Sequence, residues 1–151
     1  MIHRIQLLTE PEEISRLYEF LKQFPLDYPD YSRWLEKCKR ELELGYKKAF
    51  YATNSNGRII GSIIFQPHKQ ERQILELKNL RVDPSYEQKG AGSLLESLAS
   101  LYADENGFKR IQCDAHADNP VVLFMQKKGY VIEAKESLYT AKKESILVKD
   151  L

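Results

Sequence analysis

The sequence is poor in the residues that build cross-links and metal centres. Only two of its 151 residues are cysteines, Cys38 and Cys113, and they form no C-x-x-C pair. This spacing gives no sign of a disulfide framework, and we expect both thiols to be small buried hydrophobic groups. The three histidines, His3, His68 and His116, are too scattered to predict a metal site.

Long apolar runs and an excess of one charge are also lacking. No stretch approaches a membrane-spanning helix, and the N-terminal "MIHRIQLLTEPEE" lacks the apolar run of a secretory signal, so we expect a cytoplasmic protein without a membrane partner. The 23 Lys and Arg residues nearly balance 22 Asp and Glu residues, giving a net charge of +1. This balance predicts no nucleic-acid partner.

What the sequence does contain is the composition of a globular protein. Hydrophobic residues make up 42% and charged residues 30% of the chain. No linker or repeat interrupts it, and its length suits one domain. We therefore predict a single domain over residues 1–151.

The first half of the chain predicts a strand, two helices and a hairpin. Residues 2–8 are typical of a strand, and Thr9 with Glu12 predicts a capping box for a helix that runs to about Phe24. The remaining elements of this half are a helix over about 31–45 and a hairpin over 47–68 that turns at Asn56 and Gly57.

The next strand, "QILELKNLRVDP", changes its alternation in the middle. Leu75 and Leu77 occupy odd positions, whereas Leu80 and Val82 occupy even ones. Strand side chains have a period of two, so these four residues share one face only if an extra residue lies between the pairs. The pattern predicts a β-bulge near Lys78 and Asn79. The alternative is a strand buried on both faces.

The second half alternates helices and strands. The predicted elements are a helix from Gly92 to Asn106, a strand in "KRIQCDAHA", a helix with Asn119 as N-cap and Gly129 as its stop, and a C-terminal hairpin from Tyr130. The predicted order is β-α-α-β-β-β-α-β-α-β-β. This order favours an α/β (α+β) fold with a mixed, partly parallel central sheet covered by helices.

Two glycines, Gly90 and Gly92, stand where a strand gives way to a helix. The first N–H groups of a helix have no internal partners, and missing Cβ atoms let a phosphate approach them. Lys89 adds a positive charge beside them. No G-K-[S/T] follows, which excludes a P-loop, and Leu95 disagrees with a dinucleotide-binding fingerprint. The alternative is a flexible turn.

The wider stretch "LRVDPSYEQKGAGSLLESL" resembles the acetyl-coenzyme A signature of the GNAT superfamily of N-acetyltransferases. The matching residues are Val82, Pro84, Tyr86, Gly90, Gly92 and Leu95. The later "NPVVLFMQKKGY" resembles another segment of that family, and the likeness covers most of residues 2–151. It implies a GNAT-type sheet with a bulged, splayed strand pair and helices on both faces.

The resemblance also implies a site for acetyl-CoA as co-substrate. Backbone groups of Leu80, Arg81 and Val82 would pair with the pantetheine arm, and the Leu80 N–H is a candidate donor to the oxyanion. The loop and helix start would hold the pyrophosphate with Glu87, Gln88, Lys89, Gly90, Ala91, Gly92 and Ser93. Asn119 would contact the cofactor, and the adenosine phosphates would meet Lys89, Arg81, Lys127 or Lys128.

Two positions depart from the family pattern. Glu87 stands where the family has Gln or Arg, and it places a carboxylate near the pyrophosphate. The family's tyrosine, which protonates the leaving thiolate in many members, falls on Met125 or Gln126 according to the register. Tyr130 is nearby, but we expect it in the core.

The catalytic candidates are Glu76 and His116. Glu76 aligns with the carboxylate base of the histone-acetyltransferase branch; otherwise it is an ordinary strand glutamate. His116 follows the next strand and is the second candidate for a base. Cys113 is available for a covalent route, but no histidine is placed beside it by sequence.

The expected function is acetyl-CoA-dependent N-acetylation, by direct attack of a primary amine of a small molecule, a protein lysine or an N-terminus. The alternatives are a catalytically weak acyl-CoA-binding or regulatory module, and an interaction protein without a cofactor. The region of the first two helices carries an aromatic and acidic set that suits a cationic amine or simply packs the helices: Phe24, Asp27, Tyr28, Asp30, Tyr31 and Trp34. Family analogy alone suggests a homodimer.

Overall fold

The computed structural model describes residues 2–136 and 144–151. The elements follow the predicted order, with one additional 3₁₀ turn. They are β1 (Arg4–Leu7), α1 (Pro11–Gln23), α2 (Tyr31–Glu43), β2 (Lys48–Thr53), β3 (Ile59–Pro67), β4 (Ile74–Val82), η1 (Pro84–Tyr86), α3 (Ala91–Glu105), β5 (Arg110–His116), α4 (Val121–Lys127), β6 (Val131–Glu136) and β7 (Glu144–Asp150).

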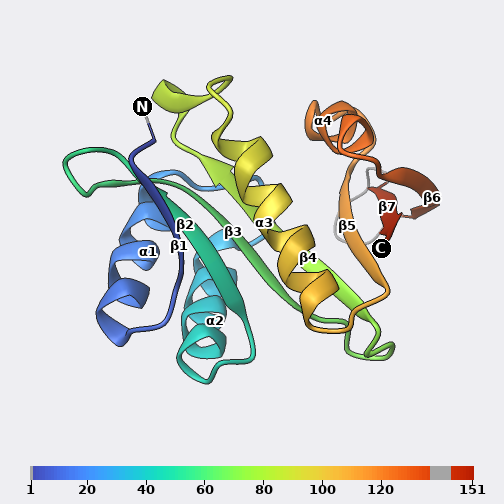
Figure 1. Cartoon of the computed structure of the whole chain (residues 1–151), viewed down its shortest axis with the longest axis horizontal. Coiled ribbons are helices and arrows are strands. Elements are labelled where there is room, and N and C mark those ends of the chain that lie inside the picture. The colour runs from blue at the N-terminus through green and yellow to red at the C-terminus, as the bar shows by residue number, and fades with distance from the viewer. Residues whose placement is uncertain (1, 137–143) are drawn as a thin grey trace.

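The described strands form one seven-stranded mixed sheet in the order β1-β2-β3-β4-β5-β7-β6. The β4–β5 pair is parallel, and the other neighbours are antiparallel. In Figure 1, α3 crosses the front of the sheet, and α1 and α2 lie behind it. The mixed sheet with helices on both faces confirms the predicted fold class. The strands of the C-terminal hairpin are confirmed, and its connection, 137–143, lies outside the described residues.

The parallel pair β4–β5 opens after a short ladder. Only Ile74–Glu76 pairs with Arg110–Gln112. Beyond this point β4 continues along β3 as far as Val82, while β5 continues along β7 as far as His116. The predicted splayed pair is therefore present, and we call the gap between the two strands the split.

The predicted bulge lies on β4 at Lys78. Asn79 pairs with Ile64 and Leu77 pairs with Phe65, which leaves Lys78 as the extra residue. As a result the leucines on both sides of the bulge pack into the same core beneath α3. The shift in alternation therefore marks a bulge rather than a strand buried on both faces.

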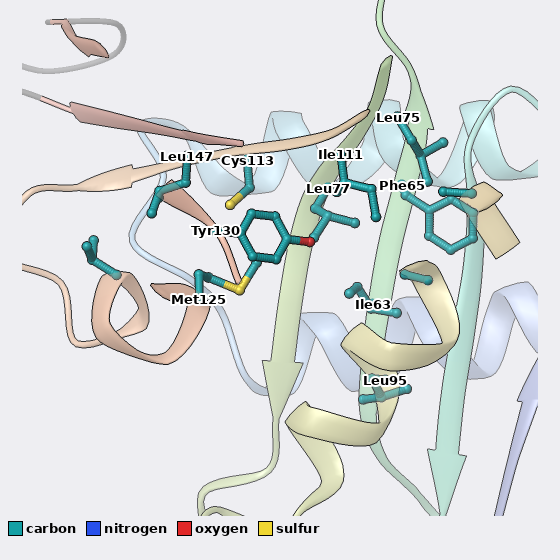
Figure 2. Close-up of a cluster of buried hydrophobic side chains, with 13 residues drawn as sticks. Ile63, Phe65, Leu75, Leu77, Leu95, Ile111, Cys113, Met125, Tyr130 and Leu147 are labelled. Carbon is teal, nitrogen blue, oxygen red and sulfur yellow. The ribbon is translucent and has the colours of Figure 1, made fainter. Parts of the chain in front are cut away.

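Two hydrophobic cores lie on opposite faces of the sheet. The core under α3 joins the two sides of the split, and Figure 2 shows Tyr130 within it among Cys113, Met125 and Leu77. The other core packs α1 and α2 on β2 and β3, and of the described residues it includes none from β5 or β7. The split is thus bridged by apolar side chains on one face only.

The predicted capping box of the first helix is wrong by one residue. The N-cap is Glu10, not Thr9, and the partner is Glu13, not Glu12. The Glu10 N–H donates to Glu13 Oε1 at 2.8 Å. Glu13 is only 9% exposed and also accepts a hydrogen bond from Tyr51 in β2. This long-range contact, which the local sequence does not show, fixes the start of the helix.

Candidate functional site

The free edge of β4 begins at the split. Leu80, Arg81 and Val82 lie on this stretch, and among residues 2–136 and 144–151 their only strand partner is β3. The side chain of Leu80 packs in the core under α3. The Arg81 Nε donates to the carbonyl of Phe24 at 3.0 Å, so the guanidinium is held on the α1–α2 side. At these positions, the groups that a ligand in the split would contact are therefore backbone groups.

The segment after β4 is anchored before it reaches α3. Asp83 is 2% exposed, forms an ion pair with Arg58 and accepts from the Ser85 N–H at 2.9 Å. The Tyr86 hydroxyl accepts from Asn54 Nδ2 at 3.1 Å. These contacts fix the loop to the turn between β2 and β3, while Glu87, Gln88, Lys89 and Gly90 are exposed.

The N-terminus of α3 is open to a ligand. Gly90 is the N-cap with φ +91°, and no heavy atom of the described part of the chain would lie within 4 Å of a Cβ there. The N–H groups of Ala91, Gly92 and Ser93 have no partner within the helix, and they carry the positive end of its dipole. A Cβ on Gly92 would meet Phe124 at 3.7 Å, an ordinary contact. Gly90 is therefore required by its backbone, whereas Gly92 is required neither by φ nor by packing.

A cation lies at the first turn of this helix. The Lys128 ammonium donates to the carbonyl and hydroxyl oxygens of Ser93 at 3.3 and 3.0 Å. Lys89 lies with its Nζ 5.7 Å from the centre of the Tyr86 ring. Positive charge, unpaired helical N–H groups and open space together fit a diphosphate. The exposed Glu87 carboxylate is free to turn to solvent.

Asn119 lies at the start of α4. Its Oδ1 accepts from the Val121 N–H at 3.0 Å, which is the capping bond that the sequence predicts, although the regular helix begins only at Val121. The capping bond uses the side-chain oxygen of Asn119. The contact of Asn119 with a cofactor stays a prediction.

The two catalytic candidates share one face of the sheet. Glu76 pairs with Gln112 across the short parallel ladder, and His116 is four residues further along β5, so both point to the face that carries α1 and α2. The Glu76 carboxylate lies 3.7 Å from the Lys78 ammonium and is 15% exposed. His116 Nδ1 lies 3.7 Å from a carboxylate oxygen of Glu144.

The structure adds two residues that sequence reasoning missed, Asp114 and Glu144. They are diagonal neighbours on one face of the β5–β7 ladder, and their carboxyl groups interact with each other. Burial raises the pKa of both, opposed by Lys78 at Asp114 and by His116 at Glu144. The alternation of polar residues along β5 marks Asp114, but Glu144 comes from a distant strand and no local pattern places it.

The residues at the family's tyrosine position do not supply an acid. Met125 is 3% exposed in the core, and Gln126 is exposed. Tyr130 is 2% exposed, as expected of a core residue, and its hydroxyl donates to Glu96 at 2.8 Å. Burial raises the pKa of the Tyr130 hydroxyl above its usual value, and the negative charge of Glu96 is the second cause of this rise. Burial also raises the pKa of the Cys113 thiol to about 12, which argues against a covalent route.

The aromatic residues of the α1–α2 connection pack on one another. The ring centroids of Tyr28 and Trp34 are 4.9 Å apart, and Tyr31 and Trp34 are stacked at 5.7 Å. The Tyr28 hydroxyl donates to the carbonyl of Lys78 at 2.6 Å. The cluster therefore serves packing, and it also places an aromatic cover directly on the bulge of β4.

Neither a metal centre nor a membrane span is found in the described residues, 2–136 and 144–151. No three His, Cys, Asp or Glu side chains there are grouped to hold a metal ion. No helix in these ranges combines the length and apolar character that a bilayer span needs.

The fold and the site define a class: a mixed α/β protein in which two parted strands lie beside an exposed helix N-terminus. The GNAT acetyltransferase family model matches residues 14–130. The chain belongs to this family. A search of curated proteins gave no significant match.

Solved structures agree with this fold. A putative GNAT acetyltransferase from Desulfovibrio desulfuricans is 13% identical with TM-score 0.84, over 97% of this chain and 98% of that one. The ribosomal-protein-S18-alanine N-acetyltransferase of Escherichia coli is 18% identical with TM-score 0.76, over 97% and 94%. The PaiA N-acetyltransferase of Thermoplasma acidophilum in complex with coenzyme A is 18% identical with TM-score 0.72, over 99% and 100%.

Proposed function

We propose that this protein is an acetyl-CoA-dependent N-acetyltransferase that passes the acetyl group directly to a primary amine of a small molecule or a protein. The observation that carries the proposal is the free edge of β4 leading to the open N-terminus of α3. An extended arm can pair with such an edge, and a diphosphate can bind the helix N-terminus. Coenzyme A contains both groups, and a protein of this fold has been solved with it.

The residues proposed for the cofactor fall into two groups. The backbone of Leu80, Arg81 and Val82 would bind the pantetheine arm. The phosphates would meet the segment from Glu87 to Ser93, with Lys128 at its end. Asn119 would contact the cofactor from the start of α4. Bound acetyl-CoA would supply an activated acyl carbon and a thiol leaving group.

The protein must also remove a proton from the acceptor. An amine of pKa about 10.4 is neutral in only about one molecule per thousand at pH 7, so a side chain near the split has to collect the proton. Glu76 and His116 are the proposed candidates, and both face the side of the sheet that carries the α1–α2 connection. The N–H of Leu80 is the proposed donor to the oxygen of the thioester.

The cofactor site is tested by a pair of glycine variants. Gly90→Val and Gly57→Val place the same side chain at φ +91° and +78°, in open space in both cases. Both variants carry similar backbone strain, of order 1–2 kcal/mol. We expect calorimetry to show that Gly90→Val loses coenzyme A binding by at least about 30-fold, whereas Gly57→Val binds like the wild type.

Equal binding in the two variants would place the phosphates elsewhere and would remove the basis of the proposal. Absence of coenzyme A binding by the wild type at millimolar concentration would favour the interaction protein instead.

A second candidate function is a weakly catalytic acyl-CoA-binding or regulatory module. The observation that favours it is the absence of a usable acid at Met125, Gln126 and Tyr130. Incubation with acetyl-CoA and a panel of small amines and lysine peptides, followed by mass spectrometry, separates the two. Tight binding without an acetylated product in the whole panel would favour the module.

The remaining assignments belong to the same proposal. We place residues 1–151 in one N-acetyltransferase domain, in the cytoplasm, with an amine acceptor as its partner and with no nucleic-acid or membrane partner. A homodimer through a sheet edge is part of it by analogy with the family.

A further inference from the structure

Beside the split, one face of the sheet gathers polar side chains from three strands. The register of β3 places them: Glu76 lies opposite Gln66, and Asn79 lies opposite Ile64. Gln66 and Ile64 are alternate residues of one strand, so Glu76 and Asn79 face the same side, on which Ile64 packs with α1 and α2.

The other two strands complete this surface. Asp114 lies between Gln112 and His116 in the same alternation, and Glu144 lies opposite His116 in the β5–β7 ladder. We call the surface the carboxyl face. It consists of Glu76, Lys78, Asn79, Asp114, His116 and Glu144.

The centre of the carboxyl face is the pair Asp114–Glu144. Asp114 and Glu144 are diagonal neighbours on one face of the β5–β7 ladder. Two ionised carboxylates placed together away from water repel each other, so the pair favours a form that holds one proton between them. Glu144 is 4% exposed, whereas Asp114 is half-buried. Asp114 is therefore the member that a ligand in the split can reach, and Glu144 is the buried member behind it.

Asn79 is an independent sign of a ligand. It is 3% exposed, and neither its Nδ2 nor its Oδ1 has a hydrogen-bond partner among the described residues. Buried amides are nearly always hydrogen-bonded, because an unmet donor or acceptor is costly. Asn79 directly follows the bulge residue Lys78, whose ammonium reaches Glu76 at 3.7 Å. Asn79 Oδ1, an acceptor without a partner among the described residues, lies on the same face of the sheet as Glu76 and Asp114.

The charge of the carboxyl face selects the ligand. Three groups of the face set its charge: the carboxylate of Glu76 and the shared-proton pair carry one negative charge each, and Lys78 carries one positive charge. The sum is one negative charge, which suits one ammonium group and repels an anionic acceptor. The aromatic cover formed by Tyr28 and Trp34 lies on the bulge next to it.

We infer that the carboxyl face binds the acceptor as a primary ammonium ion between Glu76, Asn79 and Asp114, and that the Asp114–Glu144 pair takes the proton that the nitrogen must lose. This inference rests on the proposed function. It assigns the proton transfer to a pair of residues and leaves Glu76 as the counter-charge of the ammonium ion. His116 is then a positioning residue that acts on Glu144.

The proton balance is complete with these groups. The ammonium gives one proton to the pair, which then holds two. The nitrogen forms its bond to the acyl carbon, the carbon–sulfur bond breaks, and the second nitrogen proton leaves with the thiol sulfur. The pair returns to its one-proton form by releasing one proton to water. One proton is released for each ammonium that is acetylated.

A binding experiment tests the pair without turnover. The protein, saturated with coenzyme A and labelled with ¹³C in its Asp and Glu carboxyl groups, is titrated with pH in the presence of n-butylamine or n-butanol. We expect the butylammonium ion to move the titration of Asp114 and Glu144 to lower pH, because a bound cation favours the loss of the shared proton. The neutral alcohol should leave it unchanged.

Kinetics then separate the roles, using the amine of the panel that is acetylated fastest. Asp114→Asn should lower kcat by about 100-fold or more and move the acid limb of the pH profile to lower pH. Glu76→Gln should raise KM for the amine by about tenfold and keep the acid limb in place. Asp150→Asn, at the opposite end of the same β5–β7 ladder, should change neither value by more than about twofold.

Further variants guard against misfolding and against a simple structural role. Glu144→Gln should move the acid limb of the pH profile as Asp114→Asn does. If one of the two variants is unstable, the other still provides the test. Asn79→Leu should raise the melting temperature, since it removes an unmet amide, and should raise KM for the amine. A melting temperature that falls would mean that water satisfies the amide, and the ligand role of Asn79 would be wrong.

The inference fails independently of the proposed function. If coenzyme A binds and acetyl transfer occurs, but butylammonium leaves the titration unchanged or Asp114→Asn keeps the wild-type profile, the carboxyl pair is not the proton acceptor. If coenzyme A does not bind at all, the proposed function itself is wrong.

Discussion

Glu13 shows how one side chain connects a helix terminus to the sheet. Its carboxylate accepts from the backbone of Glu10 at the start of α1, from Gln6 in β1 and from the Tyr51 hydroxyl in β2. Burial alone would raise the pKa of Glu13, but these hydrogen bonds outweigh burial and lower it to about 2. The charged form of Glu13 therefore stabilises the folded protein.

The stabilisation by Glu13 should depend on pH. A carboxyl group whose pKa falls on folding contributes above its unfolded pKa, near 4.5, and loses this contribution as the pH falls toward 2. We expect Glu13→Gln to lower the free energy of unfolding by about 2–3 kcal/mol at pH 7. Urea denaturation at pH 7 and at pH 3 should show a smaller difference from the wild type at pH 3. A difference that stays constant with pH would mean that the charge of Glu13 is not what stabilises the fold.

At this scale the sequence predicts residues whose role is local. Gly129, which the sequence predicts as the stop of its helix, has φ +100°. Tyr130 is in the core, as expected. Glu13 and Glu144 escape prediction because their partners lie on other strands, and no spacing along the chain carries that information.

Among the elements, α3 is fixed by a buried carboxylate that meets α4 and β7. Glu96 is 1% exposed and accepts from the Lys149 ammonium at 2.7 Å, while the Lys128 ammonium lies 3.6 Å from its other oxygen. Burial alone would raise the pKa of Glu96, but the bonds from Lys149, Ser100 and Tyr130 lower it. This cluster holds the N-terminal half of α3 against the far side of the split.

Removing the main partner of Glu96 should be costly. Lys149→Met leaves a buried carboxylate with only the more distant Lys128 to balance it, so we expect the free energy of unfolding to fall by about 2–3 kcal/mol. Lys127→Met, at an exposed lysine in the last turn of α4, is the control and should change it by less than about 0.5 kcal/mol. Denaturation of the two variants side by side measures the difference, and equal losses would show that Glu96 is not balanced by Lys149.

The elements themselves follow from local patterns to a large extent. The shift of Leu75 and Leu77 against Leu80 and Val82 predicts the bulge, because the period of a strand is strict and four leucine and valine side chains need one core. The position of β7 between β5 and β6 is not predicted, since strand order depends on pairing between distant segments. The carboxyl face depends on that order, so the sequence indicates Asp114 but not its partner.

Over the whole molecule, two sheet halves are joined by the short β4–β5 ladder and by the core under α3. That core draws residues from both sides of the split, including Leu77 and Leu147. Such a shared core argues that the halves unfold together, as the proposed single domain requires.

A single unfolding transition is therefore expected. Differential scanning calorimetry should give one peak whose calorimetric and van't Hoff enthalpies agree, and saturating coenzyme A should shift it upward as a whole. Two peaks, of which coenzyme A moves only one, would mean that the strands beyond the split form a separate cooperative unit.

The reactivity of the two cysteine thiols reports local opening of the protein. Cys38 lies on the buried face of α2 and Cys113 lies on β5 in the core under α3, on opposite sides of the sheet, and burial raises the pKa of each to about 12. At neutral pH almost no thiolate exists, so an alkylating reagent modifies either sulfur only when its layer opens. The rates of modification at the two positions thus measure the opening of each layer separately, without the introduction of any label.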